Sequence, residues 1–154
     1  MNQKVARYMF IACGIWLIGL GVYFIVLRPP LLPEDLRYVG TTLARARVAL
    51  PGLEAWLARV FTVLGGFIAG NGVLTVFVAL APAPSRSGKF LALALSGLLT
   101  VGLMSASNFA LHSDFRWLLL VPAVLWLAGL VLLGLRRPKP PDPQPEQLET
   151  PSPS

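Results

Sequence analysis

Four long uncharged runs constrain the fold of this chain more than any other feature. They cover residues 8–27, 60–80, 90–110 and 117–135, and none contains Asp, Glu, Lys or Arg. An α-helix of about 20 residues crosses the roughly 30 Å of bilayer hydrocarbon. No run alternates apolar with polar residues, and an open sheet edge cannot lie in lipid. The sequence therefore predicts an all-α integral membrane protein with four transmembrane helices.

The composition and the connections extend this prediction. Apolar residues make up 55% and charged residues 13% of the chain, which is unlike a soluble domain. Because the connections 81–89 and 112–116 are short, we expect helices two and three, and then three and four, to form antiparallel hairpins. Residues 1–135 would then form one domain, a four-helix up-and-down bundle. The first helix is expected to be retained, because Arg28 and bulky residues replace a signal-peptide cleavage site.

Two segments lie outside the predicted bundle helices. Segment 33–50 starts with Pro33 and two acidic residues and continues with apolar residues at helical spacing, so we predict an outer amphipathic segment, divided into two short helices near Gly40. We expect it to lie at the membrane interface; the alternative is a lid over a binding site. Segment 136–154 is rich in proline and lacks apolar periodicity, which predicts a disordered cytoplasmic tail.

The orientation follows from the lysines and arginines beside the predicted helices. With the N-terminus inside, the cytoplasmic flanks hold Lys4, Arg7, Arg86, Lys89, Arg136, Arg137 and Lys139. The outer flanks hold Arg28, Arg37, Arg45, Arg47, Arg59 and Arg116. The totals are close, but the cytoplasmic charges crowd the helix ends, which favours both termini inside. The net charge of +6 then reflects topology and attraction to the lipid bilayer, and we expect no nucleic-acid partner.

The chain lacks the residues that several kinds of catalytic and cofactor chemistry require. Cys13 is the only cysteine and His112 the only histidine, so the chain has no internal disulfide, no redox pair of cysteines and no cluster typical of zinc or haem. No carboxylate lies within an uncharged run, and no glycine-rich phosphate loop is present. We therefore expect no cofactor, no metal and no enzymatic activity.

The remaining candidate site is polar and uncharged in its membrane part. Ser105, Asn108 and His112 share one helix face by their spacing. The full candidate polar pocket comprises Asn71, Thr100, Ser105, Asn108, His112, Asp114 and Arg116. The alternative is ordinary hydrogen bonding at a membrane boundary, with Ser113 as the N-cap of the fourth helix.

Asn71 lies near the middle of the second run, at the predicted depth of two tryptophans. Because a buried indole needs an acceptor, we expect Asn71 to face the bundle interior and to bond Trp16, Trp126 or Thr100. The alternative is that Asn71 lines a wet cavity and contacts a ligand.

The same run carries a cluster of small residues, which lets helix backbones approach in lipid. The cluster comprises Gly65, Gly66, Ala69, Gly70 and Gly72, of which Gly66 and Gly70 form a GxxxG motif. We expect it to pack inside the bundle; a homodimer face is the alternative.

The order of these parts resembles small uncharacterised bacterial membrane proteins of four helices, of the DoxX-like and domain-of-unknown-function type. The resemblance depends on Arg28-Pro29-Pro30, on the stretch from Leu32 to Tyr38, and on Arg59-Val60-Phe61 followed by Gly65-Gly66. It implies the bacterial inner membrane and no assigned activity.

Two functions fit these features. The first is a non-catalytic accessory or scaffold component, which implies a membrane-protein partner or a homo-oligomer. The second is transport or binding of a small molecule along Asn71, Thr100, Ser105 and Asn108.

Overall fold

The computed structural model describes residues 2–82 and 85–135, and every regular element in these ranges is a helix. The long elements are α1 (Asn2–Val26), α4 (Leu53–Leu80) and α7 (Arg116–Gly134). A third long stretch, between α4 and α7, consists of α5 (Arg86–Gly97), the π-helix η1 (Leu98–Gly102) and α6 (Leu103–Ala110). Two short helices, α2 (Pro33–Val39) and α3 (Leu43–Ala49), lie between α1 and α4. The predicted tail 136–154 falls outside the described residues.

Four of these stretches are long and apolar enough to cross a membrane: Gln3–Val26, Leu53–Leu80, Ser87–Ala110 and Arg116–Gly134. Each contains most or all of one predicted uncharged run. The helices begin earlier than the runs, and α4 takes in Glu54 and Arg59. Charged residues are compatible with a helix end in contact with water, so the uncharged runs indicated the apolar part of each helix and not its first turn.

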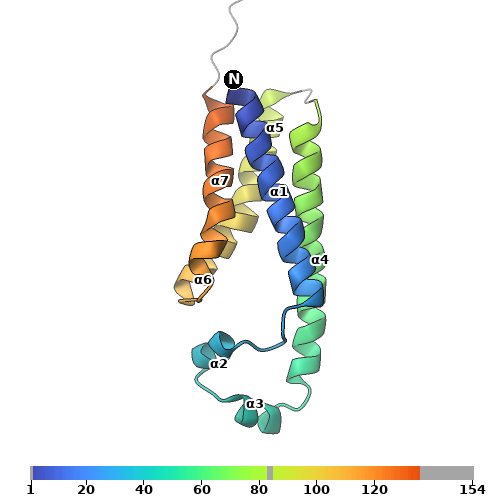
Figure 1. The fold of residues 1–154 in the computed structure, drawn as a ribbon, viewed down its shortest axis with the longest axis vertical. Helices are drawn as coiled ribbons and strands as arrows, with labels where there is room; N and C mark the ends of the chain where they lie inside the picture. Colours follow the sequence, from blue (N-terminus) through green and yellow to red (C-terminus); the bar gives the residue numbers. More distant parts are fainter. Residues whose placement is uncertain (1, 83–84, 136–154) are drawn as a thin grey trace, which may run out of the picture.

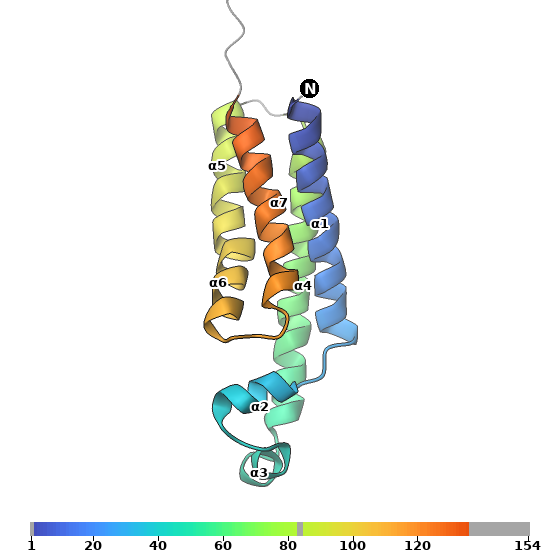
Figure 2. The same ribbon diagram turned by 60° about the vertical axis from the view of Figure 1, so that its left-hand side comes forward.

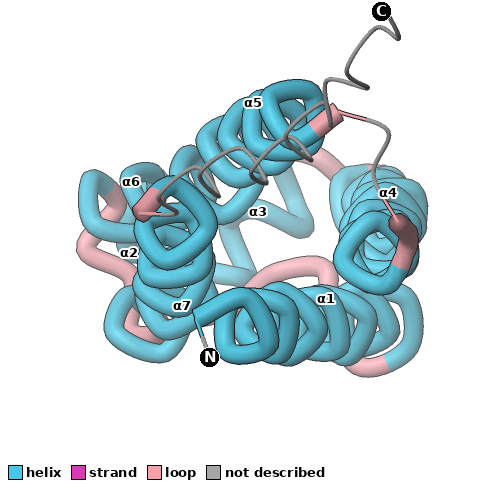
Figure 3. Tube along the Cα trace, turned by 90° about the horizontal axis from the view of Figure 1, so that it is seen from above, coloured by secondary structure: helices cyan, strands magenta, loops and turns pink. Residues whose placement is uncertain are grey.

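The long helices pack unequally (Figure 1). Seen from the end in Figure 3, α1 lies between α4 and α7, and it contacts both closely. The stretch α5–η1–α6 packs against α7. The backbones of α4 and α5 approach each other at few points, although the two helices are consecutive. The closest contact of α4 is therefore with α1, while a hydrogen bond between Ser96 and Asn71 joins α4 to α5; the antiparallel hairpin of helices two and three stays a prediction.

Glycines explain the close approach of α1 and α4. A Cβ atom on Gly72 would lie 2.6 Å from the Gly14 carbonyl oxygen, and one on Gly65 would lie 2.6 Å from that of Gly21. On α1, Gly14 and Gly21 are seven residues apart, and so are Gly65 and Gly72 on α4. This spacing places each pair along one stripe of its helix. Ala69 lies in the same contact, beside Gly21.

The GxxxG motif does not take part in this contact. A Cβ atom on Gly66 or Gly70 would meet nothing within 4 Å. The prediction that these two glycines pack inside the bundle is therefore wrong. The physical reason is helical phase: two residues one position beyond Gly65 and Ala69 are turned about 100° away from the stripe that faces α1.

Trp126 is the centre of the core between α1, α5 and α7, with 2% of its surface exposed. Its ring packs edge-to-face on Phe10, with centroids 5.6 Å apart. The indole N–H donates to the Leu93 carbonyl at 2.9 Å. A Cβ atom on Gly97 would overlap the indole, so only glycine leaves room for it. The π-helix η1 starts at the next residue, as expected where a side chain bonds into the hydrogen-bond ladder of a helix.

The segment between α1 and α4 folds as two short helices, which confirms the predicted division near Gly40. Gly40 ends α2 with φ 71°, in the left-handed region that favours glycine. Thr42 caps α3 by accepting from the Arg45 N–H. Figure 2 shows both helices at one end of the molecule, beside and below the start of α4. We name this end of the molecule the His112 end, and the opposite end the Lys89 end.

Candidate functional site

Segment α2 is attached to the turn between α6 and α7 by polar contacts. The Glu34 carboxylate accepts from the Ser113 hydroxyl at 3.1 Å and from the Asp114 backbone N–H at 2.9 Å. Arg37 forms an ion pair with Asp114 at 2.6 Å. We name these contacts the Glu34 clamp. Sequence reasoning missed it, because the partners are about 80 residues apart and no local pattern joins them.

Arg28 holds the start of the same segment. Its side chain is only 9% exposed and pairs with Asp35 at 3.2 Å. The guanidinium lies over the Phe61 ring, 3.6 Å from the centroid, and also contacts Phe24. Asp35 in turn accepts from the Leu32 N–H at the start of α2. Arg28 therefore joins the start of α2 to the aromatic side chains of α1 and α4 at the His112 end.

Helix α3 is attached to α4 by a third ion pair. Arg47 donates two hydrogen bonds to the Glu54 carboxylate, at 2.9 and 3.1 Å. The bonded Glu54 raises the pKa of the Arg47 guanidinium, which is charged at any physiological pH in either case. Because both side chains lie at the surface, the pair orients α3 more than it stabilises the fold.

The predicted polar pocket is not assembled along the long apolar helices. Thr100 and Asn108 donate to carbonyls of their own helix, those of Ser96 and Met104. Ser105 is buried and donates to the Leu119 carbonyl at 2.9 Å, which joins α6 to α7. These side chains therefore satisfy backbone groups.

The three pocket residues nearer to the surface lie around the α6–α7 turn. His112 is exposed and has φ 51°, Asp114 belongs to the Glu34 clamp, and Arg116 starts α7. Ser113 accepts from the Phe115 N–H, but the N-cap position of α7 is Phe115 itself. The predicted N-cap is thus two residues off.

Asn71 does not bond Trp16, Trp126 or Thr100, so that prediction is wrong. Its Oδ1 accepts from the Ser96 hydroxyl at 3.1 Å, which links α4 to α5. Trp126 bonds the Leu93 carbonyl instead, and Thr100 bonds its own helix. The Asn71 Nδ2 is buried and has no hydrogen-bond partner.

Two open depressions along the long helices bear on the predicted polar path. One, of about 290 Å³, is lined by apolar parts of α1 and α7 that include Trp16, Gly19 and Leu118. The other, of about 800 Å³, we name the α4 groove. The α4 groove is lined by Val63, Gly66, Phe67, Gly70, Asn71, Val73 and Leu74. Neither depression is lined by Thr100, Ser105 or Asn108.

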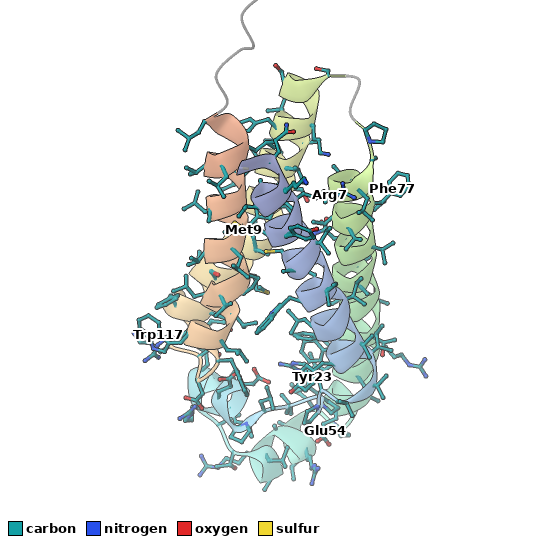
Figure 4. The ribbon with its side chains drawn as sticks, turned by 45° about the horizontal axis from the view of Figure 1, so that its top comes forward. Arg7, Met9, Tyr23, Glu54, Phe77 and Trp117 are labelled. Atoms are coloured by element: carbon teal, nitrogen blue, oxygen red, sulfur yellow. The ribbon has the colours of Figure 1, made fainter. Side chains whose placement is uncertain are left out.

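The carboxylates of the described residues gather at one end of the molecule; Figure 4 shows Glu54 at this end and Arg7 towards the other. The acidic residues in the part of the chain that the structure describes are Glu34, Asp35, Glu54 and Asp114. All four lie at the His112 end, in α2, in the first turn of α4 or in the α6–α7 turn. Within residues 2–82 and 85–135, no group of three or more His, Cys, Asp or Glu residues is placed to hold a metal ion.

No protein family, no curated protein and no solved structure matches the chain.

Proposed function

We propose that this chain is a multi-pass protein of the bacterial inner membrane, an up-and-down bundle with both termini in the cytoplasm. We further propose that it is a non-catalytic accessory component, which binds a transmembrane helix of a partner protein in the α4 groove. The single observation that supports this function most is the outward direction of the GxxxG motif, whose glycines meet nothing within 4 Å.

The α4 groove has the chemistry of a helix-docking surface. Gly66 and Gly70 remove side chains from its floor, while Phe67 and Leu74 beside them are 75% and 63% exposed. In lipid, apolar burial does not drive helices together, so association depends on close packing at small residues. A partner helix gains such packing here, and α1 does not compete because it uses the stripe of Gly65 and Gly72.

The transport hypothesis has less support from the same geometry. A polar path needs side chains that are free to contact a solute, and Thr100, Ser105 and Asn108 are bonded to backbone carbonyls. Of the proposed path, Asn71 lines the α4 groove, and the other three residues line neither of the two depressions described above.

The experiment is affinity purification of the full chain from gently solubilised membranes. We expect a partner membrane protein in stoichiometric amount with the unmodified chain, and its loss with the double variant Gly66→Ile and Gly70→Ile. Gly19→Ile is the matched control, because Gly19 also has open space around it but lies on α1.

Three results would contradict the proposal. Retention of the partner by the double variant would exclude the α4 groove as the docking surface. Recovery of a second copy of this chain alone would indicate a homo-oligomer. Recovery of a bound small molecule without a partner protein would favour transport.

A further inference from the structure

Lys89 is held at the point where α4 ends and α5 begins. Its ammonium donates to the Ala81 carbonyl at 3.1 Å, and Ala81 is the C-cap residue of α4. The side chain is half-buried. Lys89 also lies in the first turn of α5, where the N–H groups form the positive end of the helix dipole.

Arg7 approaches the same point from α1. It precedes Gly14 by seven residues, and Gly14 contacts the Gly72 and Val76 region of α4. Arg7 is therefore on the stripe of α1 that faces α4, and Figure 4 shows it on that side. Val76 and Ala81, whose carbonyl accepts from Lys89, both lie towards the C-terminal end of α4, so Arg7 and Lys89 approach the same end of that helix.

No described residue neutralises this pair of cations. The ion pairs of the described residues all lie at the His112 end, and so do all of their carboxylates. The C-terminal end of α4 offsets only about half an elementary charge. Two cations from different helices thus lie near the end of α4 with no carboxylate of the described residues beside them.

We propose that Arg7 and Lys89 bind the phosphate group of an anionic lipid. An arginine matches two phosphate oxygens with its planar fork, and a lysine adds a point charge with two donors still free after its bond to Ala81. The α5 amides add a positive dipole on the same side. A phosphate between the two side chains makes an attractive contact with each of them.

Depth indicates a lipid rather than a dissolved phosphate. This step depends on the proposed membrane placement. Arg7 lies four residues into the span Gln3–Val26, and Lys89 lies two residues into Ser87–Ala110. At about 1.5 Å per residue, both Cα atoms are within about 6 Å of the start of the apolar spans. The phosphate groups of a bilayer lie just outside its hydrocarbon, within reach of both side chains.

The test measures the melting temperature of the purified full chain in a zwitterionic detergent. Phosphatidylglycerol, phosphatidylcholine with the same acyl chains, and inorganic phosphate are added in separate titrations. We expect phosphatidylglycerol to raise the melting temperature most, and added salt to weaken the effect. The double variant Arg7→Gln and Lys89→Gln should bind phosphatidylglycerol at least tenfold more weakly. The matched control is Arg45→Gln with Arg59→Gln, which removes two exposed arginines that form none of the ion pairs found.

Each other outcome overturns the proposal. Equal stabilisation by phosphatidylglycerol and phosphatidylcholine would show that the negative charge of the lipid does not contribute to binding. Stabilisation by inorganic phosphate alone would assign the cations to a dissolved anion. Unchanged affinity in the double variant would place the lipid elsewhere. If that variant does not fold, the lipid comparison and the salt dependence of the unmodified chain still decide. Partner capture by the α4 groove is measured separately, so the two proposals can fail independently.

Discussion

At the scale of single residues, the buried indole N–H of Trp126 determines which residues can lie in the helix beside it. An indole within an apolar span has no water to bond, so it must find an acceptor in the protein. Trp126 takes the Leu93 carbonyl, and Gly97 is the residue that leaves room for the ring. The sequence indicated the need for an acceptor but not which one, because a backbone carbonyl has no residue type to recognise.

The first prediction concerns this glycine. Gly97→Ala places a methyl group against the Trp126 indole, and overpacking of this kind costs about 1–3 kcal/mol. We expect a lower melting temperature in detergent, measured by circular dichroism, and a shift of tryptophan fluorescence. Gly19→Ala is the control, because its new methyl group meets nothing within 4 Å. Equal melting temperatures of both variants would show that the indole does not occupy this position.

The second prediction uses the asymmetry of the contact between Asn71 and Ser96. Ser96→Ala leaves the whole Asn71 amide without a side-chain partner in an apolar setting, which should cost about 1–3 kcal/mol. Asn71→Leu also removes the unpaired Nδ2, so we expect a smaller loss. The double variant should be no less stable than Ser96→Ala alone. Thermal unfolding of the three variants forms a double-mutant cycle, and additive losses would refute the contact.

At the scale of elements, the sequence predicted helices better than their contacts. Long uncharged runs determine the four apolar stretches, and Gly40 marks the division between α2 and α3. The contacts depend on which side of each helix faces its neighbour. A motif such as Gly66 and Gly70 does not indicate that side by itself. The sequence did contain a pattern that could have predicted the contact between α1 and α4. Gly14 and Gly21 have the same seven-residue spacing as Gly65 and Gly72. The Glu34 clamp had no such signal.

The third prediction tests how α2 is held. Glu34→Gln keeps the shape of the side chain and removes the charge that accepts from Ser113 and Asp114. We expect hydrogen exchange of the backbone amides of residues 34–39 to become several-fold faster, measured by mass spectrometry. Glu54→Gln is the matched control, since it should loosen Leu43–Ala49 and leave α2 unchanged. Unchanged exchange in the Glu34 variant would show that the clamp does not hold α2.

At the scale of the whole molecule, the positions of the described carboxylates distinguish the two ends, which the count of lysines and arginines along the sequence did not. Lysines and arginines resist translocation because they are positively charged. Three arginines of the His112 end, Arg28, Arg37 and Arg47, form ion pairs with carboxylates. The Lys89 end has no carboxylate among the described residues, so the charges of Arg7 and Lys89 are not offset in this way. The sequence alone does not reveal this difference between the two ends, because partners such as Arg37 and Asp114 are far apart along the chain.

The fourth prediction is that the Lys89 end faces the cytoplasm. Cys13 is the only cysteine and is buried, so a single cysteine added at the surface can be labelled selectively. We choose Arg45→Cys in α3 and Ser87→Cys in the first turn of α5, because both positions are exposed. In intact bacterial cells, or in spheroplasts, a thiol reagent that cannot cross the membrane should label Arg45→Cys. It should label Ser87→Cys only after the membrane is permeabilised. The reverse pattern would invert the orientation, and labelling of both positions in intact cells would contradict membrane insertion with four crossings.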